Sequence, residues 1–171
     1  MSKKCVIITA PGFQDEEVVY PYYRLMEEGH SVEVATKDGA VVYGKYGVPA
    51  RATMATTDLK SANFDCVILP GGFEAPDRVR LLPEVQVFVR EMDEQKKLVA
   101  AICHGPWIMI SAKVCKGRKM TAFWSIEEDI RNSGADYQHK VPVVIDDNFI
   151  TSPHYNNNGD FMKAVIGYLN G

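Results

Sequence analysis

The segment 98–106, Leu-Val-Ala-Ala-Ile-Cys-His-Gly-Pro, constrains the fold of this chain more than any other. Its apolar run is typical of a strand buried on both faces, and it stops at Cys103, where His-Gly-Pro turns the chain into a helical pattern. A nucleophile on a sharp strand-to-helix turn is the elbow of Gly-x-Ser-x-Gly hydrolases, here with sulfur in place of the hydroxyl. Because a helix N-terminus is partially positive, we expect this turn to favour the thiolate of Cys103.

Three further apolar runs, rich in β-branched residues, have the same character and alternate with helical patterns. They cover residues 5–9, 31–36 and 64–69. The helix expected over 83–97 has one apolar stripe, and the helix expected over 15–28 contains Pro21, which should kink or split it. This alternation predicts right-handed βαβ units and an α/β three-layer sandwich on a mainly parallel sheet.

The remaining segments add smaller elements. Residues 40–53 have the pattern of a small β-hairpin excursion. After the elbow helix we expect a strand at 119–122, a helix at 125–132, paired strands around 141–145 and 148–152, and a last helix after Gly159. With 171 residues and no linker, residues 1–171 are expected to form one domain.

Charge and cysteine usage exclude several classes of function. The net charge is −3 and no basic block occurs, which argues against nucleic-acid binding. The apolar run before Pro11 is too short for a signal peptide or a membrane span, so a cytoplasmic protein without a membrane partner is expected. The four cysteines are scattered without a Cys-x-x-Cys pair, so we expect free thiols and neither a zinc site nor a disulfide framework.

Three loops follow predicted strands and should meet at one edge of the sheet, where open parallel sheets collect functional groups. They are residues 12–17, residues 70–73 and the pair Cys103-His104. A backbone N–H from Gly71-Gly72 and that of His104 could form an oxyanion hole opposite the sulfur. The alternative is that Gly-Gly is an ordinary turn.

Each candidate acid or base also has a structural alternative. His104 adjoins Cys103, but neighbours across a sharp turn often point apart. His154, at another strand end, is a second candidate base or an exposed loop histidine. Glu17 could reach the elbow and would have to stay protonated beside a thiolate, or it is part of an acidic helix start. Cys103 itself could be a buried structural thiol.

Several motifs together resemble the PfpI-type intracellular protease family, within the glutamine-amidotransferase-like superfamily that includes the parkinsonism-associated deglycase. The resemblance runs nearly end to end. Its motifs are Asp-Glu-Glu-Val-Val-Tyr-Pro-Tyr at 15–22, Glu-Glu-Gly-His at 27–30, Ile-Leu-Pro-Gly-Gly at 68–72, Ala-Ile-Cys-His-Gly-Pro at 101–106 and Gly-Arg-Lys at 117–119.

The resemblance implies a flavodoxin-like sandwich that forms homodimers or larger rings and needs no cofactor and no metal. It implies that Cys103 is the nucleophile, that Glu17 hydrogen-bonds it and that His104 belongs to a proposed peptidase triad. The acid of that triad comes from a neighbouring subunit, and Asp77 matches its position. Gly72 and His104 would supply the oxyanion-hole amides.

Three segments depart from the family pattern. The loop from Phe73 to Asp77 is one residue longer than usual and has aspartate in place of glutamate. Phe123-Trp124 replaces a common Tyr-Pro pair, which removes a hydroxyl. Ser-Pro-His at 152–154 stands where many relatives have Ser-Arg, so His154 replaces a positive charge near the pocket.

Two classes of function follow. The first is a cysteine-dependent hydrolase that acts on small carbonyl compounds, as a glyoxalase or protein deglycase, or on peptides. We favour the carbonyl substrates because a small site at a subunit interface suits compact aldehydes. The second class is an oxidative-stress sensor or chaperone based on Cys103 oxidation. A lyase or hydratase with a pocket around Phe123, Trp124 and His154 is a weaker third possibility.

Overall fold

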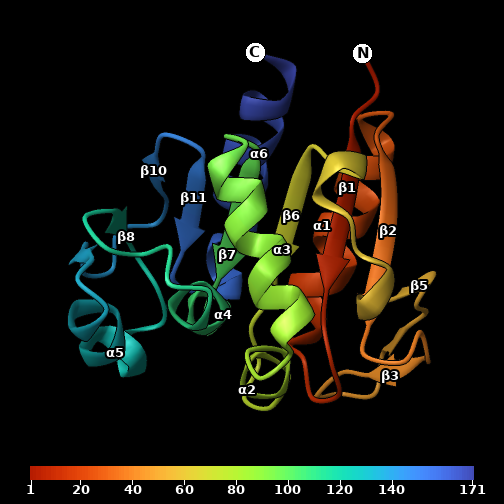
Figure 1. The fold of residues 1–171 in the computed structure, drawn as a ribbon, viewed down its shortest axis with the longest axis horizontal. Helices are drawn as coiled ribbons and strands as arrows, with labels where there is room; N and C mark the ends of the chain where they lie inside the picture. Colours follow the sequence, from red (N-terminus) through yellow and green to blue (C-terminus); the bar gives the residue numbers. More distant parts are fainter.

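A seven-stranded sheet forms the centre of the molecule in a computed structural model of residues 1–171, and helices cover both faces of the sheet (Figure 1). The strand order is β10-β11-β7-β6-β1-β2-β5, and every neighbouring pair is parallel except β10–β11 at the edge. The strands are β1 (Lys4–Ile8), β2 (Ser31–Thr36), β5 (Met54–Ala55), β6 (Cys66–Leu69), β7 (Leu98–Ile102), β10 (Val144–Asp146) and β11 (Phe149–Ser152). The predicted mainly parallel sheet is confirmed.

Two pairs of helices complete the three layers. Helix α1 (Asp15–Glu27) packs beside α6 (Asn158–Asn170), and α6 also contacts β7 and β11. Helix α3 (Pro83–Glu94) contacts β6, β7 and α4 (Pro106–Ser111). Short helices α2 (Ala75–Val79) and α5 (Glu127–Asn132) both pack against α4. None of the helices combines the length and apolar character needed to cross a membrane.

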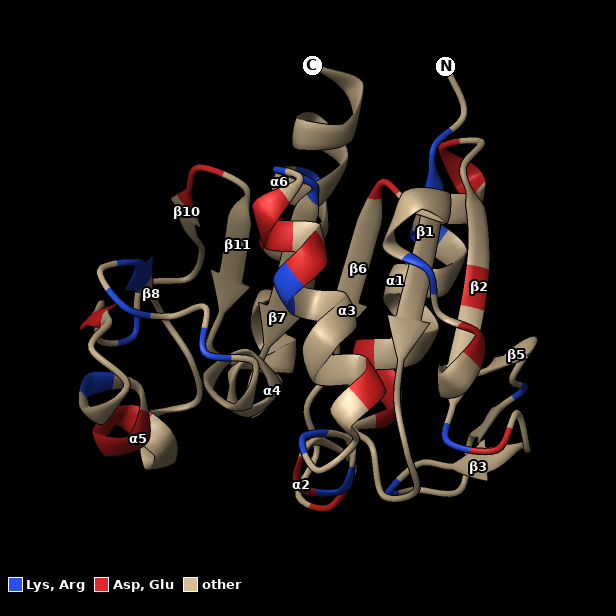
Figure 2. Ribbon diagram, in the orientation of Figure 1, with Lys and Arg blue, Asp and Glu red and all other residues tan.

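The central strands are buried on both faces, as their sequences predict. Every residue of β6 and β7, and of β1 after Lys4, has no exposed surface. Charged residues lie on the covering helices instead of on these strands: Figure 2 shows acidic and basic residues along α3, whereas β6, β7 and β11 carry none. Burial of these apolar strands is the main source of stability for this layer of the fold.

Helix α1 corrects one expectation. Pro21 lies inside the helix and does not split it, since α1 runs unbroken from Asp15 to Glu27. Pro21 is buried together with Val18 and Leu25, which lie three residues before it and four residues after it. These three side chains share one helical face, so packing against the sheet holds both halves of the helix in line despite the missing backbone hydrogen bond.

Two small sheets lie outside the central one. The predicted hairpin excursion is confirmed, with β3 (Val42–Tyr43) antiparallel to β4 (Pro49–Ala50). The strand expected at 119–122 is shorter, β8 (Lys119–Met120), and pairs with β9 (Asp136–Tyr137) instead of joining the central sheet. The three residues after β8 lead into the 3₁₀ turn Trp124–Ile126.

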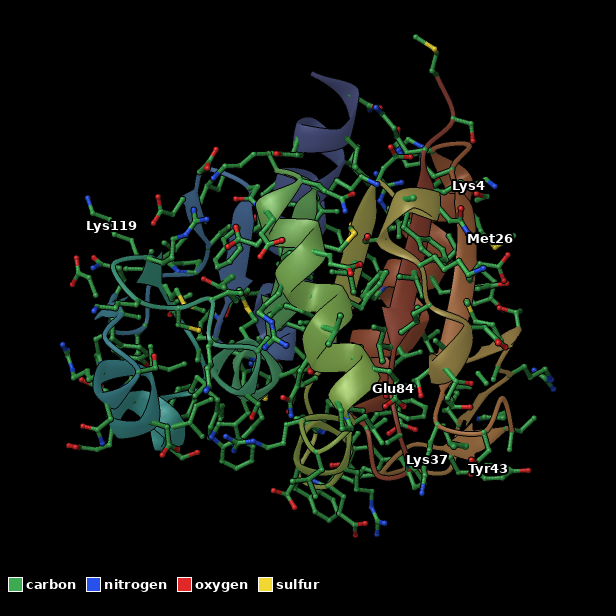
Figure 3. The ribbon with its side chains drawn as sticks, viewed as in Figure 1. Lys4, Met26, Lys37, Tyr43, Glu84 and Lys119 are labelled. Carbon is green, nitrogen blue, oxygen red and sulfur yellow. The ribbon has the colours of Figure 1, made fainter.

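The carboxyl ends of the parallel strands meet at one edge of the molecule. In Figure 1 they point downward, toward α2, α4 and β3, and both chain termini lie at the opposite end. Figure 3 shows the same polarity, with Lys4 and Met26 near the top and Lys37 and Tyr43 near the bottom. Strands β2 and β6 flank β1 on opposite sides, so the strand order reverses at β1, where open α/β sheets bind ligands.

Candidate active site

Cys103 occupies the predicted elbow. It directly follows β7 and has φ = 61°, a left-handed conformation that costs a non-glycine residue about 1–2 kcal/mol. Two hydrogen bonds from segments distant in the chain hold it there: its N–H donates to the Ser152 carbonyl at 2.9 Å, and its carbonyl accepts from the Phe123 N–H at 2.9 Å. The strained backbone of the nucleophile is therefore fixed by β11 and by the segment after β8.

The turn is possible only because glycines surround it. A side chain at Gly71 would lie 2.7 Å from the Cβ of Cys103, and one at Gly105 would lie 2.0 Å from the Leu69 carbonyl oxygen. Gly72 has φ = 107°, and it pairs with Phe13 in an isolated bridge that joins the loops after β6 and β1. Gly-Gly is thus more than an ordinary turn, because it lets the loop backbone approach the sulfur.

Glu17 is the buried acid of the site. It lies in the first turn of α1 and has no exposed surface. Its Oε2 accepts the Gly71 N–H at 2.6 Å, whereas Oε1 has no hydrogen-bond partner. Burial raises the pKa of Glu17 to about 8, and the Gly71 N–H only partly opposes this shift. Glu17 is therefore protonated at neutral pH, as a carboxyl beside the nucleophile was expected to be.

The expected thiolate form of Cys103 is not supported. Burial is the main cause that raises the pKa of the thiol, and Glu17 raises it further once its carboxyl is ionised. The backbone N–H groups of Gly72 and His104 face the sulfur and lower this pKa, but they do not outweigh burial. Desolvation of a thiol that is only 7% exposed exceeds the effect of a helix terminus, so Cys103 is a thiol at neutral pH and needs a base.

His104 contacts the sulfur directly, in spite of its position next to Cys103 in the chain. Its Nδ1 lies 3.2 Å from Cys103 Sγ, and its Nε2 lies 3.2 Å from Ser125 Oγ. The ring stacks on Phe123 at 5.0 Å and 25° and meets the edge of Trp107 at 5.2 Å. Burial lowers the pKa of His104, which leaves a neutral imidazole that can accept a proton from the thiol.

His154 lies in the same pocket with a different orientation. Its Nδ1 accepts the Asn156 N–H at 3.2 Å and so caps a 3₁₀ turn. Burial lowers the pKa of His154, so the neutral ring carries its proton on Nε2. The neutral ring of His154, which lines the pocket, can therefore donate a hydrogen bond from Nε2, and it stacks with Phe123 at 5.9 Å and with Trp124 at 5.8 Å.

A pocket of about 240 Å³ opens onto the sulfur. It is lined by Gln14, Lys45, Gly72, Phe73, Cys103, His104, Phe123, His154 and Tyr155. Sequence reasoning named Gly72, Phe123 and His154 and placed Gln14 and Phe73 in the loops of the site, but it missed Lys45 and Tyr155. The volume lies below the range of roughly 300–1,000 Å³ typical of sites for drug-sized ligands, which favours a compact substrate.

The hairpin brings Lys45 to the pocket through Asp15. The buried Asp15 carboxylate accepts the N–H of Tyr46 at 2.9 Å and of Val48 at 3.0 Å, and the Lys45 N–H donates to the Phe13 carbonyl at 2.8 Å. Asp15 thus fixes the loop between β3 and β4 against α1. The sequence shows that an acidic residue begins the helix. It does not show that this residue binds the hairpin.

Asp77, the candidate triad acid, lies apart from this cluster. It is exposed on α2 and makes no hydrogen bond or ion pair within the chain, so His104 receives no acid from its own chain. Ser125 occupies the second nitrogen of His104 instead. No group of three or more His, Cys, Asp or Glu side chains is arranged to hold a metal ion. All four cysteines are free and buried.

Comparisons with known proteins extend over the whole chain. A family model described as the DJ-1/PfpI family matches residues 3–167. Deglycase PfpI of Pyrococcus furiosus is 41% identical over 166 residues, which is 97% of this chain and 99% of the relative. Deglycase TK1284 of Thermococcus kodakarensis is 42% identical over the same length, with the same two coverages.

Solved structures share the fold as well. A two-domain protein from Anabaena variabilis, which contains DJ-1/ThiJ/PfpI-like and ferritin-like domains, matches with a TM-score of 0.95 and 36% identity. The match covers 99% of this chain and 48% of that protein, so this chain spans about half the length of the two-domain relative.

Proposed function

The chain belongs to the DJ-1/PfpI family, and from this premise we propose that it is an enzyme whose Cys103 thiol adds to the carbonyl carbon of small aldehydes, or of the adducts that they form on proteins. The observation that carries the proposal is the contact of 3.2 Å between Cys103 Sγ and the neutral His104 imidazole at the base of a small pocket. Relatives that match over nearly their full length are named deglycases.

The proposed first step needs only groups of this chain. The Cys103 thiol proton passes to His104 Nδ1 while sulfur forms a bond to the carbonyl carbon, and the π electrons of the carbonyl move to its oxygen. The N–H groups of Gly72 and His104, which face the sulfur, stabilise the oxyanion. Nδ1–H then protonates the oxygen, and the product is a hemithioacetal, with no atoms gained or lost.

Glu17 supports this step as a neutral acid. Below about pH 8 it carries no charge, so it does not oppose the negative charge that develops on sulfur. Oε1 has no other partner in the chain, so a proton on it is free to be donated, and Cys103 is the neighbouring side chain with which the Glu17 carboxyl interacts. We therefore assign Glu17 the role of stabilising the sulfur, and His104 the role of moving the proton.

Peptide hydrolysis, the competing reaction of the same nucleophile, fits the pocket less well. A peptide must extend on both sides of its scissile carbonyl, whereas this pocket has about 240 Å³. Peroxide sensing, the second class of function, depends on a readily ionised thiol. Burial raises the pKa of Cys103, which favours base-assisted attack over spontaneous oxidation.

We also propose that the chain forms a homodimer or a larger homo-oligomer with the site near an interface. Tyr20 and Tyr23 on α1 line one surface hollow with Tyr46, which lies on the hairpin loop that also carries Lys45, and Tyr23 and Tyr46 are 64% and 68% exposed. Such a cluster of exposed aromatic side chains is typical of a protein interface. Light scattering on the purified protein, compared with a Tyr23→Asp variant, tests this; a wild-type monomer at micromolar concentration contradicts it.

The test of the function measures methylglyoxal consumption, release of adducts from a glycated peptide, and casein cleavage in parallel. Cys103→Ala should reduce the first two activities to background, while Cys115→Ala, which removes another buried thiol that lies outside the pocket, should retain them. Turnover of casein alone, or full aldehyde turnover by Cys103→Ala, would overturn the proposal. Selective peroxide oxidation of Cys103 without turnover would support the sensor.

A further inference from the structure

Two aromatic side chains hold the half-buried His104 ring. Phe123 stacks on one face and Trp107 packs against it edge-on, so the ring has little freedom to rotate. In this orientation Nδ1 points to Cys103 Sγ and Nε2 points to Ser125 Oγ, each at 3.2 Å. Both ring nitrogens therefore have partners, and the partner of Nε2 determines which nitrogen carries the proton.

Ser125 is held in place by the nucleophile itself. It lies in the 3₁₀ turn Trp124–Ile126, directly after Phe123, whose N–H donates to the Cys103 carbonyl at 2.9 Å. The Ile126 N–H donates to the Phe123 carbonyl at 3.0 Å and closes the turn. Ser125 is exposed and is not one of the residues that line the pocket, and His104 is the side chain that its hydroxyl contacts.

We propose that Ser125 is a positioning residue for His104. Its hydroxyl oxygen accepts Nε2–H in the resting enzyme, which leaves the lone pair of Nδ1 directed at the Cys103 thiol. When Nδ1 takes the thiol proton, the same oxygen holds the Nε2–H of the imidazolium. The effect on catalysis rests on the proposed function, but the effect on the tautomer does not.

A hydroxyl in this position has a chemical consequence that differs from that of a carboxylate. A carboxylate would raise the pKa of His104, whereas a neutral hydroxyl leaves it low, in line with the lowering that burial causes. The imidazole therefore stays available as a base at neutral pH. Ser125 takes the place that the resemblance assigns to an acid such as Asp77, which does not contact His104 in the chain.

The experiment compares Ser125→Ala, Ser125→Thr and Asp77→Asn with the wild type. Ser133→Ala is the matched control, because it removes a hydroxyl from the end of α5, away from His104. The resting proteins are labelled with ¹⁵N-histidine, and the ring nitrogen shifts of His104 report its tautomer. Aldehyde turnover then gives kcat, KM and the pH profile of kcat/KM.

We expect the wild type to show the Nε2–H tautomer and Ser125→Ala to lose it. In that variant kcat should fall about tenfold, the rate equivalent of one hydrogen bond, with KM unchanged. The imidazolium loses an acceptor, so the acid limb of the pH profile should move to lower pH. Ser125→Thr keeps the hydroxyl and should restore both properties, and Asp77→Asn should leave the tautomer as in the wild type.

The inference is overturned if Ser125→Ala keeps the wild-type nitrogen shifts, or if Asp77→Asn changes them and Ser125→Ala does not. The second result would assign the positioning role to an acid from another subunit. If the shifts respond as expected but the wild type turns over no aldehyde, the proposed function fails and the positioning role of Ser125 stands.

Discussion

Glu17 lies beside the Cys103 thiol, and the charge of Glu17 raises the pKa of that thiol. The two side chains come from the first turn of α1 and from the turn after β7, which meet where the strand order reverses. Because the pKa of Glu17 is about 8, the pair is uncharged at neutral pH and loses its first proton only in mildly alkaline solution. Two predictions follow from this shared titration.

The first concerns stability. The pKa of Glu17 is 4.5 in an unfolded chain and about 8 in the folded one, so between these pH values the native state binds more protons. The free energy of unfolding must therefore fall as pH rises through this window, by about 1.4 kcal/mol per unit of pKa shift. Glu17→Gln carries no charge at any pH. Urea unfolding should show Glu17→Gln gaining stability relative to the wild type from pH 4.5 to 8.

The control for this series is Glu33→Gln, which removes a carboxylate that is already exposed to solvent on β2. Its stability difference from the wild type should stay small and nearly constant over the same pH range. A Glu17→Gln variant whose advantage does not grow with pH would show that the Glu17 carboxyl ionises in the folded protein as easily as in water.

The second prediction concerns the reactivity of the thiol. Above about pH 8 the wild-type Glu17 is a carboxylate, and its charge opposes ionisation of Cys103. Glu17→Gln removes this charge, so iodoacetamide should alkylate Cys103 faster in the variant than in the wild type at alkaline pH. Peptide mapping by mass spectrometry follows Cys103 separately from the other three thiols. Equal rates above pH 8 would mean that the two groups do not interact.

Sequence reasoning predicted the strands and turns that follow from local patterns of residues. The apolar runs located β1, β2, β6 and β7, and the segment 98–106 predicted the sharp turn at Cys103, although not its left-handed backbone. Strand polarity also predicted that Glu17 would reach the elbow. The ionisation of Cys103 was predicted with the wrong sign, because a helix terminus is visible in a sequence whereas the degree of burial of one sulfur is not.

Sequence reasoning also failed to predict contacts between segments that are distant in the chain. Ser125 was predicted only as the start of a helix, and its contact with His104 depends on the packing of residues 123–126 against the elbow. Asp15 resembled an ordinary acidic helix start, but it holds the loop of the hairpin. Both roles arise from tertiary structure, and neither has a local signature.

Asp15 gives the third prediction. Asp15→Ala removes the buried carboxylate that accepts two backbone N–H groups of the hairpin loop. This loss should cost about 2–4 kcal/mol of stability. The freed loop should carry Lys45 away from the pocket and raise KM for an aldehyde, while the nucleophile and its base stay in place. Thermal unfolding and steady-state kinetics measure the two effects.

Asp160→Ala is the matched control, since Asp160 also lies in the first turn of a helix but is exposed and forms only a long ion pair with Lys163 at 3.8 Å. It should lose less than about 1 kcal/mol. If Asp15→Ala behaves like Asp160→Ala, the carboxylate contributes only to the charge at the helix start and does not hold the loop.

The last prediction tests the strain at the nucleophile. Cys103 has φ = 61°, where alanine is disfavoured and glycine is not. Both Cys103→Ala and Cys103→Gly remove the sulfur and should be inactive, but Cys103→Gly should be more stable in urea by about 1 kcal/mol. Cys115, which has no positive φ, should show the opposite order, because glycine there adds only chain entropy to the unfolded state. The same order at both positions would mean that the left-handed backbone of Cys103 stores no strain.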